Sequence, residues 1–136
     1  MKLRIILILF LLSIYGCNNK PVDNFNWHTI TVTATAYNSL KNQTSSNPHI
    51  TAWGDSLLPG KKYIAVSRDL IGLGLNHNTP VKIDGFEELF IVKDKMHTRW
   101  KKRIDIYMGL DVKKAKNWGK RKIEITYGIL KDEDKE

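Results

Sequence analysis

Hydrophobic and polar residues alternate along several short stretches of the chain, which is the pattern of half-buried β-strands. The clearest stretch runs from Thr29 to Tyr37, with aliphatic residues on one face and threonines and Tyr37 on the other. Similar short or fully apolar runs predict further strands at 63–66, 80–84, 89–92, 104–108 and 122–127. The pattern therefore indicates a mainly β domain.

Two short helices are predicted between these strands. Asp111 is a suitable N-cap for a helix that reaches about Trp118, and Ser67 is one for a turn over 68–73 that ends at Gly74. Strands this short and numerous would leave exposed edges in an open sheet. The sequence thus predicts a small closed barrel or an α+β domain.

The first residues have the pattern of a targeting segment. Lys2 and Arg4 precede an apolar run at 5–12, which is too short for a spanning helix. The segment resembles a bacterial lipoprotein signal peptide in which Cys17 is lipid-modified, although Tyr15 stands where a small residue is usual. An uncleaved anchor or a structural thiol at Cys17 is the alternative.

The predicted organisation is a single domain behind a tether. Residues 1–17 form the signal peptide with its lipidation site, 18–27 a polar tether, 28–128 the barrel domain and 129–136 a charged tail. Cys17 is the only cysteine, which excludes an intrachain disulfide and a cysteine-based zinc site.

The charge of the chain suggests an anionic partner. There are 22 Lys and Arg against 14 Asp and Glu, a net charge of +8, and +6 remains when Lys2 and Arg4 leave with the signal peptide. Outside the cytoplasm, cell-wall polymers and lipid headgroups are suitable partners. A basic surface kept for solubility is the alternative, and the export signal and missing recognition motifs disfavour nucleic acid.

Two aspartates stand in unfavourable surroundings. Asp94 follows an apolar run, and Asp105 lies between Ile104 and Ile106. Carboxylates are costly there unless they are paired, hydrogen-bonded or used chemically. Either they form a catalytic pair or they accept hydrogen bonds from the backbone or from Arg99 and Arg103.

Several motifs together resemble a known family. They are Thr33–Tyr37, Ile50–Gly54, Ile64–Val66, Ile71–Gly74, Asp94 and Ile104–Gly109. They resemble the 3D domain, a family named for three aspartates and similar to the catalytic part of membrane-bound lytic transglycosylase A and to stationary-phase survival proteins. The resemblance implies a six-stranded double-psi β-barrel and non-hydrolytic cleavage of peptidoglycan glycan strands, which leaves a 1,6-anhydro-muramyl end.

The resemblance also implies roles for single residues. Asp105 corresponds to the catalytic acid, and Asp94 to a carboxylate neighbour that disfavours ionisation of Asp105. The family's first aspartate falls at Ser67, with Asp69 as a substitute, and the usual Asp-Thr-Gly-Gly is replaced by Asp94–His97. A non-catalytic peptidoglycan-binding lipoprotein is therefore the alternative function.

Asp69 and four further residues are candidates for substrate binding. By resemblance, Tyr37 and Thr51 hydrogen-bond sugar hydroxyls; otherwise they are a packed tyrosine and a strand-end threonine. Trp53 and Trp100 either stack on sugar rings or pack in the core. The basic run 95–103 either binds wall carboxylates or is a solvated surface.

No cofactor or metal is predicted, because the four histidines are scattered and no nucleotide or serine-nucleophile motif is present. The expected partners are peptidoglycan glycan strands and a membrane reached through the lipid, and the protein is expected to be a monomer. Asn18, directly after Cys17, favours the outer membrane, with the domain facing the periplasm.

Overall fold

Six strands close into a mixed β-barrel in the computed structural model, which describes residues 22–39 and 49–132. The strands are β1 (Phe25–Tyr37), β2 (Tyr63–Val66), β3 (Pro80–Ile83), β4 (Leu89–Lys95), β5 (Arg103–Tyr107) and β6 (Arg121–Leu130). Their order around the barrel is β1-β5-β2-β4-β3-β6. This confirms the predicted mainly β, six-stranded barrel and is consistent with a double-psi barrel.

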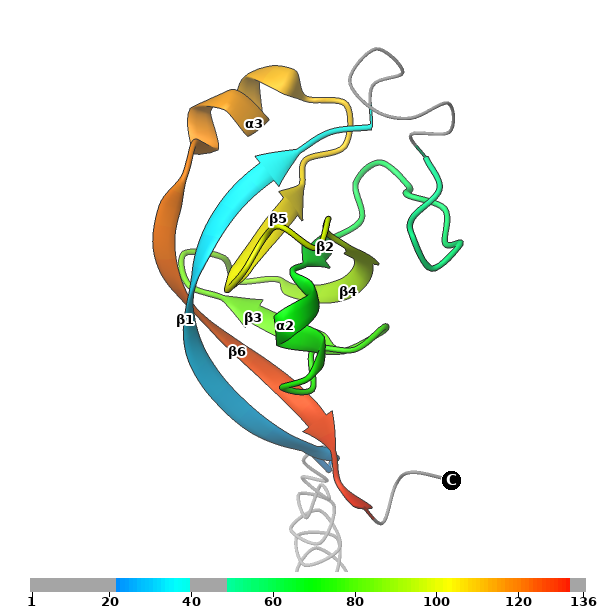
Figure 1. Ribbon diagram of the computed structural model, residues 1–136, viewed down its shortest axis with the longest axis vertical. Coiled ribbons are helices and arrows are strands. Elements are labelled where there is room, and N and C mark those ends of the chain that lie inside the picture. The colour runs from blue at the N-terminus through cyan, green and yellow to red at the C-terminus, as the bar shows by residue number, and fades with distance from the viewer. Residues whose placement is uncertain (1–21, 40–48, 133–136) are drawn as a thin grey trace, which may run out of the picture.

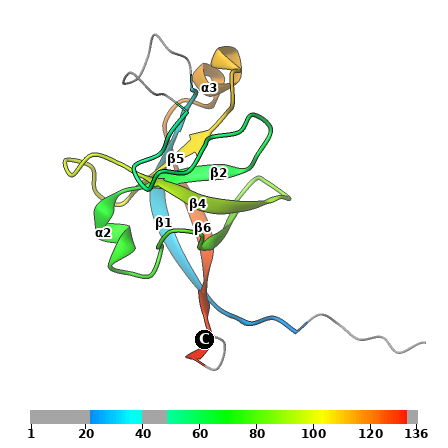
Figure 2. The ribbon, with the colours of Figure 1, turned by 90° about the vertical axis from the view of Figure 1, so that its right-hand side faces the viewer.

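Long-range pairing builds the barrel. β1 pairs with β5 in parallel and with β6 in antiparallel orientation, and β2 pairs with β4 in parallel. Parallel neighbours need crossover connections, so strands distant in sequence become adjacent. Figure 1 shows the long β1–β6 ribbon along one side of the barrel, and Figure 2 shows the shorter strands β5, β2 and β4 beside one another.

Alternate residues of every strand fill the interior. On β1, Val32 and Ala34 are buried, as the alternation predicts, and Thr31 is exposed. The other strands contribute pairs in the same way, and Leu70 and Leu75 join the cluster from the segment around α2 (Arg68–Ile71). The core members on β2 to β6 are Ile64, Val66, Val81, Ile83, Phe90, Val92, Ile104, Ile106, Ile125 and Tyr127.

The second helix, α3 (Val112–Trp118), lies at the end of the barrel where β1 finishes (Figure 1). The carboxylate of Asp111 accepts a hydrogen bond from the amide of Lys114 at 2.9 Å, which is the predicted N-cap. The lysines of α3 are exposed and Ala115 is half-buried, which confirms the predicted outward and inward faces of this helix.

Helix α2 is shorter than predicted. It ends at Ile71, because the amide of Leu75 returns to the carbonyl of Leu70 at 3.1 Å and turns the chain toward the core. Gly74 makes this turn possible: its φ is +108°, and a Cβ there would lie 2.6 Å from Ile129 Cδ1.

Both long strands extend beyond their predicted ends. β1 begins at Phe25, inside the segment predicted as tether, and β6 continues to Leu130. The ten pairs between these strands supply the backbone hydrogen bonds, and the Phe25 ring lies against Gly128, where no side chain intervenes. Cross-strand pairing thus orders residues that have no strand pattern of their own.

Several predictions concern residues outside the described ranges. They include the signal peptide, the lipidation site Cys17, positions 18–21 of the tether and the end of the charged tail. Among the residues that the structure does describe, no helix has the length and apolarity needed to cross a membrane.

The packed interior predicts a large cost for removing a core side chain. Ile125 is 1% exposed and far in sequence from the two aspartates, so Ile125→Ala should lower the free energy of unfolding by about 2–5 kcal/mol in urea denaturation. Leu110→Ala, at a side chain that is 55% exposed, is the control and should change it by less than about 0.5 kcal/mol. Equal effects of the two substitutions would contradict the assigned core.

Candidate functional site

Asp94 and Asp105 lie in one row of residues that crosses four neighbouring strands. Asp105 on β5 pairs with Thr35 on β1 and with Ala65 on β2, and Ala65 pairs with Asp94 on β4. Paired residues present their side chains on the same face of a sheet. The two acids therefore share the outer face of the barrel wall, with only β2 between their strands. We call these four residues, Thr35, Asp105, Ala65 and Asp94, the acid row.

An irregularity in β4 brings Asp94 to this face. Phe90 and Val92 point into the core, and simple alternation would direct Asp94 inward as well. However, Ile64 pairs with Val92 and the next residue, Ala65, pairs with Asp94, so β4 has Lys93 as an extra residue. A bulge of this kind redirects the side chains that follow it.

The Asp105 carboxyl group is half-buried and has one hydroxyl donor. Thr35 Oγ1 donates to Asp105 Oδ1 at 2.9 Å. Burial raises the pKa of Asp105 to about 6, and the charge of Asp94 adds to this, although the Thr35 hydroxyl and the Arg103 guanidinium act in the opposite direction. A substantial fraction of Asp105 is therefore a neutral acid near pH 6.

The Asp94 carboxylate is held by two backbone amides. The N–H groups of Ala52 and Lys95 both donate to Asp94 Oδ1 at 2.8 Å. Burial raises the pKa of Asp94 above its ordinary value, and the two amides and the Lys95 ammonium limit the rise. Asp94 thus has more donors for its ionised form than Asp105 has.

The Tyr37 hydroxyl is within the electrostatic influence of both acids. Burial raises the pKa of Tyr37, and the charges of Asp94 and Asp105 raise it further, so the hydroxyl remains protonated. This oxygen is buried and has no hydrogen-bond partner among the described residues. Since an unsatisfied buried hydroxyl is costly, an internal water is a suitable partner at this position.

A groove leads away from the row along α3. Its volume is about 500 Å³, and Thr35 and Tyr37 line it together with Val112, Ala115 and Lys116. The groove therefore adjoins the β1 end of the row that contains the two acids.

Thr51 and Trp53 belong to a turn beside Asp94. The buried Thr51 Oγ1 accepts a hydrogen bond from the Asp55 amide at 3.0 Å, which uses this hydroxyl for local structure. The half-buried Trp53 ring packs on His77, with a centroid distance of 5.2 Å, and the Lys95 ammonium lies 5.4 Å from the Trp53 ring.

Ser67 and Asp69 anchor the connection before β5. Ser67 Oγ accepts from the Arg103 amide at 2.9 Å, and Asp69 Oδ2 accepts from the Lys102 amide at 2.9 Å. Burial tends to raise the pKa of Asp69, but the Lys102 amide and the Ser67 hydroxyl outweigh it, and the pKa lies below its ordinary value. Asp69 is thus an ionised anchor of this loop.

Trp100 reaches the acid row through an arginine. The Arg103 guanidinium lies 3.9 Å from the centre of the Trp100 ring, and Arg103 Nε donates to Thr35 Oγ1 at 3.4 Å. Arg103 is one of the two arginines that the sequence offered as partners of the acids, and its charge acts on Asp105. The sequence did not single out Thr35, whose only signal was its place on the polar face of the first strand.

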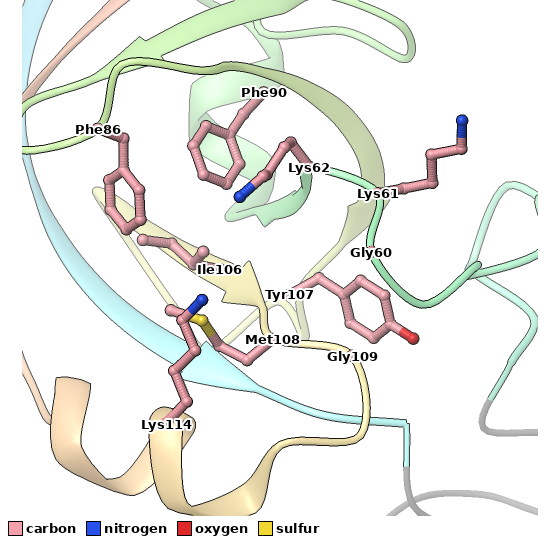
Figure 3. Close-up of a pocket in the computed structure, with 10 residues that line it drawn as sticks. All are labelled: Gly60, Lys61, Lys62, Phe86, Phe90, Ile106, Tyr107, Met108, Gly109 and Lys114. Atoms are coloured by element: carbon pink, nitrogen blue, oxygen red, sulfur yellow. The ribbon is translucent and has the colours of Figure 1, made fainter.

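A smaller pocket of about 90 Å³ lies at the end of β5 beyond Asp105. Figure 3 shows the residues that line it. Phe86 and Phe90 form one wall, and the side chains of Lys62 and Lys114 extend toward the pocket from opposite sides. Lys62 Nζ forms an ion pair with Glu88 at 2.7 Å. In the described part of the chain, no three His, Cys, Asp or Glu residues lie together as a metal site would require.

No protein-family model and no curated protein matches the sequence. Among solved structures, the chain is similar to apo expansin from Clavibacter michiganensis, with 21% identity, a TM-score of 0.48, and coverage of 77% of this chain and 52% of that one. It is also similar to a mutant of that expansin in complex with cellohexaose, with 18% identity, a TM-score of 0.46, and coverage of 75% and 50%. The chain spans about half the length of the structures it matches. The resemblance to the 3D family stays a prediction with which the barrel is compatible.

The raised pKa of Asp105 predicts a pH-dependent effect of Asp105→Asn on stability. Below about pH 4 the Asp105 carboxyl is protonated in the folded and the unfolded state, so its ionisation does not affect the free energy of unfolding. Between about pH 4 and pH 6 the unfolded state ionises first, which lowers the stability of the fold, and above about pH 6 this cost is constant. Between pH 4 and pH 8 we expect the substitution to become more stabilising by roughly 2–3 kcal/mol in urea denaturation. The exposed Asp84→Asn is the control, and a pH-independent effect of Asp105→Asn would contradict the prediction.

Proposed function

We propose that this protein is a peptidoglycan lytic transglycosylase, which cleaves the β-1,4 bond between N-acetylmuramic acid and N-acetylglucosamine and leaves a 1,6-anhydro end. The observation that carries the proposal is the acid row, in which Asp105 has a pKa of about 6 and shares a face with Asp94. A general acid works best when its pKa is near the working pH.

In the proposed reaction, Asp105 acts first as acid and then as base. Its proton passes to the glycosidic oxygen as the bond from that oxygen to the anomeric carbon breaks. The resulting carboxylate then takes the proton of the C6 hydroxyl as O6 bonds to the anomeric carbon. The proton count balances without water, so no second carboxylate is needed to activate one, unlike in hydrolytic glycosidases.

The neighbouring residues support both steps. The charge of Asp94 disfavours ionisation of Asp105 and favours positive charge at the anomeric carbon in the transition state. The Thr35 hydroxyl fixes the orientation of the Asp105 carboxyl group at 2.9 Å. The uncharged Tyr37 hydroxyl, buried near the two acids, helps to keep their surroundings poor in water.

A second candidate is a peptidoglycan-binding lipoprotein without catalysis. Ser67 favours it, because this residue stands where the resembling family has its first aspartate and is fully buried against the backbone of Arg103. Under either function, the proposed partner is the glycan strand, and the proposed location is the periplasmic face of the outer membrane with a lipid on Cys17.

The two candidates differ in the products they release from purified sacculi. We expect the wild-type protein to release anhydro-muropeptides, detected by mass spectrometry, and Asp105→Asn to lower the yield at least about 100-fold because the acid is lost. The control Asp84→Asn, an exposed aspartate, should retain activity. Sedimentation of the wild type with sacculi without any product would favour the binding protein.

The pH dependence tests the acid role of Asp105. Because the acid must be protonated in the free enzyme, kcat/KM should decline as the pH rises, with a midpoint at about pH 6. The measurement is the initial rate on solubilised glycan strands between pH 4 and pH 9. A rate that rises through pH 6 would contradict protonated Asp105 as the active form.

A further inference from the structure

Asp55 lies outside the acid row, and both oxygens of its carboxylate have side-chain partners. Lys93 Nζ donates to Asp55 Oδ1 at 3.1 Å, and His77 Nε2 contacts Asp55 Oδ2. Lys93 also donates to Asn78 Oδ1 at 2.6 Å, which ties the same ammonium group to the loop that carries His77. Asp55 therefore joins three segments: its own turn, the loop before β3, and β4.

The residues from Thr51 to Asp55 form one hydrogen-bonded turn. The Thr51 amide donates to the Asp55 carbonyl at 2.9 Å, the Asp55 amide donates to Thr51 Oγ1 at 3.0 Å, and the Gly54 amide donates to the Thr51 carbonyl at 2.9 Å. Gly54 has a φ of +86°, which suits glycine. Because the turn is bonded at both ends, the position of Asp55 fixes that of Ala52.

Ala52 is the point where this turn meets the acid row. Its amide donates to Asp94 Oδ1 at 2.8 Å, although Ala52 itself is exposed. The other groups that face Asp94 are the amide and ammonium of Lys95, with Asp105 and Tyr37 across the wall. The Ala52 amide is thus one of two neutral donors to this carboxylate, and the only one that comes from another segment of the described chain.

The bulge in β4 links the two ends of this arrangement. Lys93, the extra residue, holds Asp55, whereas Asp94, the next residue, receives the Ala52 amide. The turn therefore spans two consecutive residues of β4 and contacts each with a different group. Trp53, in the middle of the turn, packs on His77 and under Lys95, which limits its rotation.

We propose that Asp55, held by Lys93 and His77, is a positioning residue that keeps the Ala52 amide on Asp94 and so maintains the asymmetry between the two acids. The role in catalysis rests on the proposed function, but the effect on Asp94 does not. Loss of a donor to the ionised form disfavours that form. Without the clasp formed by Asp55, Lys93 and His77, Asp94 should take up a proton more readily.

The test is an NMR titration of the aspartate carboxyl carbons, with hydrogen exchange of the Ala52 amide, in wild type and Asp55→Asn. We expect the pKa of Asp94 to rise by about one pH unit and the Ala52 amide to exchange at least tenfold faster. Asp84→Asn removes the same charge from an exposed turn and should leave both readouts unchanged.

Lys93→Gln provides a second variant, because it opens the clasp from the β4 side and should shift both readouts in the same direction. It also replaces Asp55→Asn if that variant does not fold. Unchanged Asp94 titration and Ala52 exchange in a folded variant would overturn the proposal. The two proposals can fail separately. If the readouts do not change but the wild type releases anhydro-muropeptides, the positioning role of Asp55 is wrong and the proposed transglycosylase stands. If the readouts shift but the wild type releases no product, the proposed enzyme is wrong and the positioning role of Asp55 stands.

Discussion

The register of β1, β5, β2 and β4 is the constraint on which the candidate site depends. Closure of the barrel pins each strand between two neighbours, and a slip of one residue would reverse which side chains face the core. The two neighbours of Asp105 along β5, Ile104 and Ile106, are buried in the core, and this directs the acid between them to the outer face. The apolar core thus sets the position of the polar row outside it.

The two acids differ because different elements supply their donors. Asp105 receives the hydroxyl of Thr35 from the neighbouring strand, whereas Asp94 receives two amides, one of them from a separate turn. Both are partly desolvated, which raises the pKa of each. Two carboxyl groups that are both partly buried can take different protonation states when one of them has more hydrogen-bond donors to its ionised form than the other.

The connection between β4 and β5 is anchored by the segment around α2. Ser67 Oγ accepts from the amide of Arg103, the first residue of β5, and Asp69 Oδ2 accepts from the amide of Lys102, directly before it. Arg68 Nε donates to the Met96 carbonyl at 3.3 Å. Three consecutive residues, Ser67 to Asp69, therefore fix the course of the chain between the two acids.

Local patterns in the sequence were sufficient to predict where the strands and helix α3 lie. Alternation, the Asp111 cap and the buried runs depend on residues close in sequence, so β2 was placed at its observed residues. The ends of β1 and β6 were not predicted, because Phe25 to His28 are ordered by a partner strand about one hundred positions away.

By itself, the sequence determined that the chain has a six-stranded, mainly β core with two acids at strand positions. Only the tertiary structure decided that these acids share one face of the barrel wall. Asp94 has the spacing of a core residue, and an extra residue in β4, visible only against β2, moves it to the face of Asp105. Barrel closure brings Thr35 to Asp105, and loop hydrogen bonds bring the Ala52 amide to Asp94 and Asp55 to Lys93. Periodicity does not encode these contacts, because the residues are distant in sequence.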